Sequence, residues 1–190
     1  AEQAVLGKKG DDVRIDWGYF YLAAGNDRQA SMKLGEYHTV KSEFNESGAL
    51  SATNGNVSQN MQEEMPVLAY SRNLGKVDAS SSNGYLMIGY DDLYSIQYFN
   101  ENLMPYWKRN GKVDIYQAFE KAAGNYVSVM RRCGDFDKQL MEQATKDGGE
   151  SYAELCALSY RQAIAAHKLV ESKDGELLFL SKENFSNGSI

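Results

Sequence analysis

The chain has 190 residues, of which 43% are hydrophobic and 24% are charged, and its formal net charge is −6 with an isoelectric point near 5.0. This length and composition are typical of one or two small globular domains. The negative charge argues against nucleic acid or an anionic membrane as the main partner, and no apolar run reaches the roughly 20 residues of a membrane span.

The first half of the chain carries the patterns of strands and turns. Residues 12–22 alternate between two faces and predict a strand, as do the apolar runs 65–71 and 85–90. Residues 94–99 indicate either another strand or an extended approach to the helices that follow. An antiparallel β-rich portion is therefore expected up to about residue 111.

Residues 28–44 are ambiguous between helix and strand. Their apolar side chains follow helical spacing, with Asp27 as a possible N-cap and Gly48 as a possible end. A strand as far as Leu34 is the alternative. The polar stretch 47–64 predicts a loop that is longer than most, which suggests a functional or covering role.

The second half has helical periodicity. Asp114 can N-cap a helix with Gln117 at the capping-box position, and Gly134 is a natural residue to end it. A second, short helix is expected between residues 135 and 148.

A third helix is predicted over residues 152–170, with Ser151 and Glu154 as its capping box. It is apolar nearly all round, so we expect it to be buried on most faces by partners outside this chain. Residues 176–180 predict a final strand or arm. Both ends of the chain look cut, which suggests a piece of a longer protein.

Two acidic residues, Asp91 and Asp92, directly follow a strong strand within a tyrosine-rich stretch that also holds Tyr94 and Gln97. A positioned carboxylate can act as a general acid or base. Neighbouring residues on an extended chain point in opposite directions, however, so a role in a turn or helix cap is equally open.

Further polar candidates lie near the C-terminus. Lys182, Glu183 and Asn184 follow an apolar arm, where they form either a site or a solvated tail. Arg161 interrupts the apolar third helix, and we expect it to form a structural ion pair or to bind an anionic ligand group such as a carboxylate.

Several kinds of chemistry lack their motifs. His38 and His167 fit no zinc spacing, and Cys133 and Cys156 form no CxxC pair, so two free thiols are expected. The Ser-x-x-Lys, GxSxG, P-loop and GxGxxG patterns do not occur. No metal or other cofactor is therefore predicted.

The segments DWGYFYL, PVLAYSRNLGKV, GYDDLYSIQYF, CGDFD, YAELCALSYRQAIAAHKLV and LLFLSKENFSNGSI, taken in order, resemble the central domain of the glutaminase A family. The resemblance covers most of residues 13–190. It implies an α+β chain in which the end of a β-sandwich portion, residues 1–111, precedes the first helical hairpin of an (α/α) toroid, residues 112–190. It also implies a long parent protein of six-hairpin glycosidase-like architecture that is secreted, periplasmic or on the cell surface.

The same resemblance implies a hydrolase that converts glutamine to glutamate and ammonia without a cofactor, the isolated piece being inactive. The resemblance transfers no catalytic residue, so the site is our inference from the motifs. The expected catalytic residues are Asp91, Asp92 and Glu183, and the expected substrate-binding residues are Tyr94, Gln97, Arg161, Lys182 and Asn184. We expect the two polar segments, 90–94 and 182–187, to line one pocket.

Two other functions stay open. The 13 tyrosines and Trp107 could stack on sugars in a carbohydrate-active or carbohydrate-binding protein, whose two carboxylates would face each other across a cleft. The chain could also be a structural connector between domains of its parent.

Overall fold

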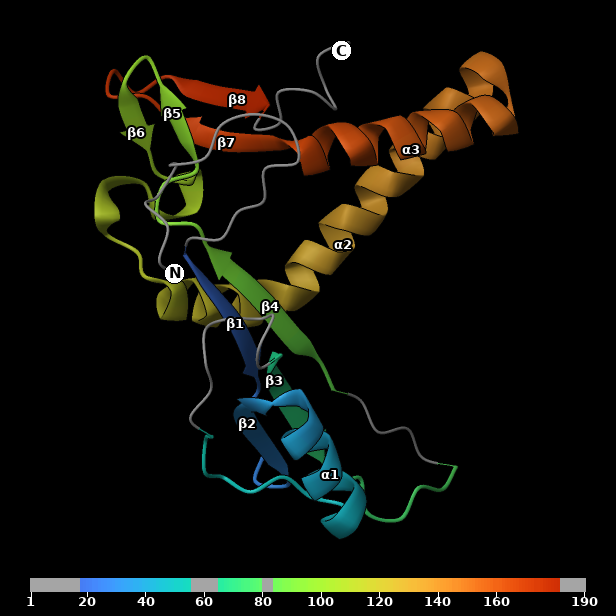
Figure 1. The fold of residues 1–190 in the computed structure, drawn as a ribbon. Helices are drawn as coiled ribbons and strands as arrows, with labels where there is room; N and C mark the ends of the chain where they lie inside the picture. The colour runs from blue at the N-terminus through green and yellow to red at the C-terminus, as the bar shows by residue number, and fades with distance from the viewer. Residues whose placement is uncertain (1–17, 56–64, 80–83, 182–190) are drawn as a thin grey trace. The chain divides into compact units, whose positions relative to one another are not determined.

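The computed structural model describes residues 18–55, 65–79 and 84–181, and its fold is α+β, with strands first and long helices later (Figure 1). The chain forms two compact units. The described part of unit 1 is residues 18–20 and 90–181, and unit 2 is Tyr21–Gly89. Strands β1 (Tyr19–Ala24) and β4 (Leu86–Asp91) pair in a two-stranded sheet, and the boundary between the units crosses both. A division at residue 111 stays a prediction.

Unit 2 contains an antiparallel pair, β2 (Ala30–Glu36) and β3 (Pro66–Arg72), with helix α1 (Tyr37–Ser47) packed against both strands. The strand alternative for residues 28–34 is therefore confirmed, and the helical interpretation of them is wrong. The predicted strand 65–71 is confirmed as β3.

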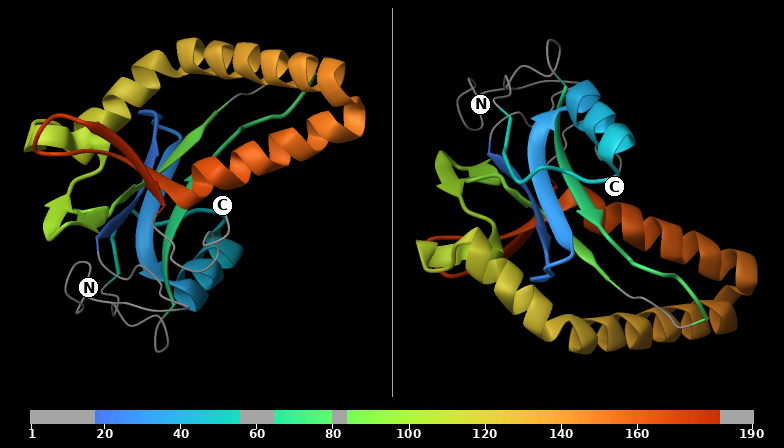
Figure 2. Two further views of the ribbon diagram at one scale, coloured as in Figure 1. Left: turned by 90° about the horizontal axis from the view of Figure 1, so that it is seen from above. Right: turned by 90° about the horizontal axis from the view of Figure 1, so that it is seen from below.

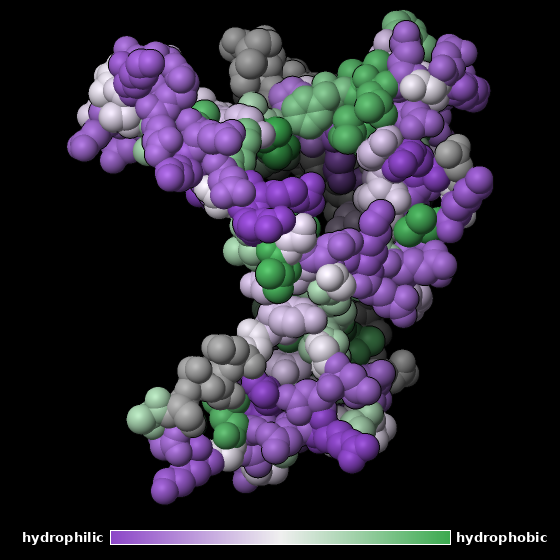
Figure 3. All heavy atoms as spheres, turned by 180° about the vertical axis from the view of Figure 1, so that it is seen from behind, coloured by the Kyte–Doolittle hydropathy of each residue, from purple (hydrophilic) through white to green (hydrophobic). Residues whose placement is uncertain are grey.

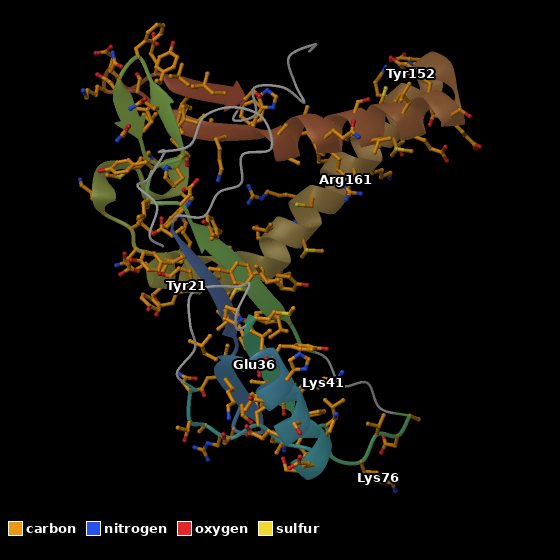
Figure 4. The ribbon with its side chains drawn as sticks, in the orientation of Figure 1. Tyr21, Glu36, Lys41, Lys76, Tyr152 and Arg161 are labelled. Atoms are coloured by element: carbon orange, nitrogen blue, oxygen red, sulfur yellow. The ribbon has the colours of Figure 1, made fainter. Side chains whose placement is uncertain are left out.

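Helix α1 begins after Glu36, which stands at its N-cap (Figure 4). The Glu36 carboxylate accepts hydrogen bonds from the backbone N–H groups of His38 and Thr39, both at 2.8 Å. These two bonds lower the pKa of the carboxyl group. Asp27, which we expected at this position, instead accepts from Gln29 N at 2.9 Å. The predicted end of the helix is correct, because Gly48 has a φ of +69° and closes the last turn.

A polar clamp fastens the far end of α1 to β2. Lys33 forms an ion pair with Glu43, and its ammonium donates a hydrogen bond to Ser51 Oγ at 2.7 Å. Ser51 N also donates to the Glu43 carboxylate. The hydrogen bonds from Lys33 and then from Ser51 lower the pKa of Glu43 to about 2.

Unit 1 holds two hairpins. Strands β5 (Ile96–Tyr98) and β6 (Glu101–Leu103) pair, as do β7 (His167–Glu171) and β8 (Leu177–Ser181), both antiparallel. The strand alternative for 94–99 is thus confirmed, and so is the strand predicted at 176–180. A 3-10 helix, Tyr106–Gly111, lies between β6 and the long helices.

The helices α2 (Ile115–Gly148) and α3 (Glu150–Ala166) form a hairpin, whose two arms meet at the turn and diverge away from it in both views of Figure 2. The Asp114–Gln117 capping box is confirmed at the start of α2. The predicted end at Gly134 is wrong, and the separate helix over 135–148 does not exist. An interior glycine costs about 1 kcal/mol relative to alanine, and a 34-residue helix tolerates that cost.

Two expectations about α3 are also wrong. Gly149 occupies its N-cap position without a side-chain hydrogen bond, so Ser151 and Glu154 form no capping box. The helix ends at Ala166, and residues 167–170 belong to β7. Pairing with β8 takes His167 out of the helix, and its Nδ1 lies 2.5 Å from the Ala163 carbonyl oxygen.

In this chain alone most of the described surface of α3 is exposed, and its burial by partners outside the chain stays a prediction. Ala153 is its one buried residue in the part of the chain that the structure describes, whereas Leu155, Leu158 and Ile164 are 58%, 52% and 46% exposed. Figure 3 shows further hydrophobic side chains on the surface of the β7–β8 hairpin. Leu177 and Phe179 of this hairpin are exposed. Among the described residues, no helix is both long and apolar enough to cross a membrane.

Candidate functional site

The two acidic residues at the end of β4, Asp91 as its last residue and Asp92 directly after it, have different surroundings. Asp91 Oδ1 accepts the backbone N–H of Leu93 at 2.9 Å and pairs with Lys108. Asp92 is only 1% exposed, and its Oδ2 accepts a hydrogen bond from Ser95 Oγ at 2.9 Å and forms an ion pair with Lys168 Nζ at 3.1 Å. Asp91 therefore stabilises the turn, and Asp92 is the carboxylate held inside unit 1.

The second oxygen of Asp92 is unusual. Asp92 Oδ1 is buried, and no donor among the described residues hydrogen-bonds to it. Most buried polar atoms have a partner in the protein or an ordered water, because an unpaired one is costly. The arrangement thus leaves one acceptor for a donor from outside the described residues.

The backbone around Asp92 is tightly held. Leu93 has a φ of +63°, which costs energy for a residue with a side chain, and Tyr94 N donates to Asp92 O at 2.7 Å. Gly18, at a φ of +93°, lies so close that an added Cβ would be 2.3 Å from Asp91 O. Strained backbone of this kind often accompanies functional sites, where surrounding contacts maintain it.

Lys168 reaches Asp92 from β7. Two residues further along the strand, Val170 is fully buried and forms a β-bridge with Pro105. Alternate residues of a strand share a face, so the buried Val170 fixes the face that also carries Lys168. The Lys168 side chain is 28% exposed, which leaves part of its ammonium accessible.

Sequence reasoning did not find Lys168 or Ser95 as site residues. Lys168 was assigned to the third helix, and no local signal connects it to a carboxylate 76 positions earlier. Ser95 lies three residues after Asp92 and could have been recognised as a hydroxyl within reach of it.

The other predicted site residues have separate surroundings. Gln97 is exposed on β5, where its Nε2 donates to Asn102 Oδ1 at 3.2 Å, and Tyr94 is half-buried. Arg161 lies on α3 and is exposed (Figure 4). Within the described ranges its side chain has no ion pair, so the expected structural pair is not present there.

The predicted C-terminal residues Lys182, Glu183 and Asn184 lie outside the described residues. A pocket shared between them and residues 90–94 therefore stays a prediction. Their assignments as catalytic and substrate-binding groups also stay predictions.

A groove of about 310 Å³ lies in unit 2 between α1 and β3. Apolar and aromatic side chains dominate its lining, which includes Val40, Phe44, Leu50 and Tyr70, with Lys41 at its edge. No carboxylate is among the residues that line it.

Among the described residues, no group of three or more His, Cys, Asp or Glu side chains is placed to hold a metal ion, and the expected absence of a metal stays a prediction. Both cysteines are free, Cys133 exposed and Cys156 half-buried.

Known proteins resemble the chain over most of its length. The family described as "Domain of unknown function (DUF5127)" matches residues 1–143, and the "Glutaminase A six helical-hairpin domain" matches residues 149–190. A protein named Glutaminase A from Aspergillus oryzae is 25% identical over 181 residues, which cover 93% of this chain and 26% of that protein. The chain thus spans about a quarter of the length of this relative. No solved structure matches it.

Proposed function

The chain belongs to the DUF5127 family and is related to glutaminase A, and we propose that it is part of an amidohydrolase. The proposed enzyme converts glutamine to glutamate and ammonia. The observation that carries the proposal is the match to a protein named Glutaminase A along 93% of the chain. The buried carboxylate of Asp92 supports it, because amide hydrolysis needs a group that can take a proton from water.

The proposed reaction is a balanced hydrolysis. Asp92 takes a proton from a water molecule, whose oxygen bonds to the side-chain amide carbon of glutamine. The C–N bond then breaks, and the proton passes to the leaving nitrogen, giving glutamate and ammonia. Asp91 has a supporting role in the proposed reaction, because Lys108 and the Leu93 N–H already bind its Oδ1.

The substrate's charged groups need partners of their own. Arg161 is exposed and could hold the α-carboxylate through the paired N–H groups of its guanidinium. Lys182, Glu183 and Asn184 stay candidates for the same site. We further propose that other domains of a longer parent protein complete it, and that α2 and α3 are the first hairpin of a helical toroid.

The test is ammonia release from L-glutamine by the full-length protein that contains this chain. We expect release in the wild type and a loss of about 100- to 10,000-fold in kcat for Asp92→Asn, the usual contribution of a general base. The control is Lys76→Ala, which changes an exposed residue of unit 2 and should leave kcat unchanged. Gln97→Ala is unsuitable as a control, because Gln97 is a candidate substrate-binding residue.

Two results would contradict the proposal. The first is a wild-type protein that releases no ammonia from glutamine, and the second is an Asp92→Asn variant as active as the wild type. A screen of glycans in parallel tests the carbohydrate-active alternative, and inactivity on both substrate classes would favour a structural connector.

The proposed location is outside the cytoplasm, as the resemblance implied: secreted, periplasmic or on the cell surface. Fractionation of the source cells with an antibody against the chain tests this location. Recovery in the cytoplasmic fraction alone would contradict it.

A further inference from the structure

We infer that Lys168 and Ser95 are positioning residues for Asp92, which hold its carboxylate so that Oδ1 binds the attacking water. This inference rests on the proposed function and names two residues that neither the motifs nor the relatives assign. The two oxygens of the Asp92 carboxylate differ in their partners.

A hydrogen bond and an ion pair converge on the same oxygen of Asp92. Ser95 Oγ and Lys168 Nζ lie 2.9 and 3.1 Å from Oδ2, while Oδ1 has no donor among the described residues. Rotating the carboxylate would break the Ser95 hydrogen bond and lengthen the ion pair with Lys168. The orientation of Oδ1 is therefore determined by groups that do not touch it.

The positive charge of Lys168 has a second effect. A buried carboxylate without a cation is strongly disfavoured in its charged form, and only the charged form can take a proton from water. Lys168 supplies that cation with a side chain that is 28% exposed, against 2% for Asp92. The ammonium thus supports both the charge and the direction of the base.

The remaining acceptor suits a single internal water. Buried waters occupy sites where protein polar atoms lack partners, and each makes about three hydrogen bonds. Oδ1 is buried and provides one of these bonds. Water held there would be oriented with a hydrogen toward the base and an oxygen lone pair free to attack.

Two lysines of unit 1 provide matched controls. Lys108 forms an ion pair with the neighbouring Asp91, and its side chain is 12% exposed, so Lys108→Met also removes a largely buried cation. Lys173 pairs with Glu101 at 2.6 Å, but its side chain is 74% exposed. In the described structure, neither forms an ion pair with Asp92.

The first experiment measures kcat and KM for glutamine in the full-length protein. We expect Lys168→Met to lower kcat by roughly 10- to 100-fold with KM within about threefold, since misplacing a catalytic group slows the chemical step more than it weakens binding. Lys168→Arg should restore most of kcat, and Ser95→Ala should lower it by a few-fold. Lys173→Met should keep kcat, and Lys108→Met measures how far the loss of a largely buried cation reduces the folded fraction.

A purely structural role for Lys168 gives a different pattern. In that case Lys108→Met and Lys168→Met would reduce the active fraction of the protein to similar extents. Lys168→Arg would also fail to restore kcat in the folded fraction. Either result overturns the inference while the proposed function stands.

The second experiment does not depend on the reaction. A high-resolution crystal structure of the full-length wild type should contain an ordered water within hydrogen-bond distance of Asp92 Oδ1, and Lys168→Met should displace it or rotate the carboxylate. A protein donor on Oδ1, or no water there, overturns the inference. If the wild type releases no ammonia from glutamine, the proposed function fails and this structure decides the inference separately.

Discussion

Replacing Gly18 by alanine should destabilise unit 1 for two reasons that can be separated. Gly18 has a φ of +93°, and such a conformation costs a residue with a Cβ about 1–2 kcal/mol. The added Cβ would also lie 2.3 Å from Asp91 O and 3.0 Å from Asp92 Cα, which are backbone atoms and not flexible side-chain ends. Overpacking of this kind costs about 1–3 kcal/mol.

The sum is about 2–5 kcal/mol, which corresponds to roughly 30- to 4,000-fold faster exchange of the amides that report unfolding of unit 1. Hydrogen–deuterium exchange of the slowest amides in β7 measures it. Gly175→Ala is the matched control, because Gly175 has a φ of +80° and nothing lies within 4 Å of its added Cβ. Its expected cost is the conformational part alone, about 1–2 kcal/mol.

The difference between the two variants isolates the close approach of Gly18 to the Asp91–Asp92 backbone. Equal exchange rates in Gly18→Ala and Gly175→Ala would refute that close approach. Wild-type rates in both variants would refute the reasoning about backbone conformation as well.

Two more predictions concern other parts of the chain. Gly134→Ala should stabilise α2 by up to about 1 kcal/mol, because Gly134 is an interior helical glycine with nothing within 4 Å of an added Cβ. Hydrogen–deuterium exchange of the α2 amides should therefore be slower, and faster exchange would contradict an uninterrupted helix. The stability that the Glu43 clamp contributes should depend on pH. The pKa of Glu43 falls from 4.5 to about 2 on folding, so this contribution is complete above pH 4.5 and is lost as the pH falls through about 2. The Ser51 amide resonance should titrate with a midpoint near pH 2 in the wild type and at higher pH in Lys33→Met, and a wild-type midpoint at 4.5 would contradict the clamp.

Sequence patterns predicted the parts of the fold that depend on neighbouring residues. The Asp114–Gln117 capping box and the end of α1 at Gly48 each involve residues within one helical turn. Strand β3 was likewise predicted from a short apolar run, and for β8 a strand was one of two alternatives. Local hydrogen bonding and burial are sufficient to determine such features.

The incorrect predictions have physical reasons in longer-range contacts. The helix cannot include His167 and Lys168, because pairing with β8 makes them a strand even though their sequence continues a helical pattern. Gly134 looked like a helix end, yet the residues on either side of it favour helix enough to offset its cost.

The candidate site shows the same division. Asp92 was found from its place after a strong strand. Its partner Lys168 was not found, because an ion pair between residues 76 positions apart leaves no periodic signal in a single sequence.

The apolar side chains of α3 will govern how the chain behaves in a purification. With Leu155, Leu158 and Ile164 about half exposed, the chain produced alone should bind hydrophobic resins and heat-shock chaperones, and it should self-associate on concentration. Ammonium sulfate strengthens such contacts, because sulfate is excluded from protein surfaces. Low-sulfate buffers and a short path from lysis to measurement are therefore the practical conditions for studying it.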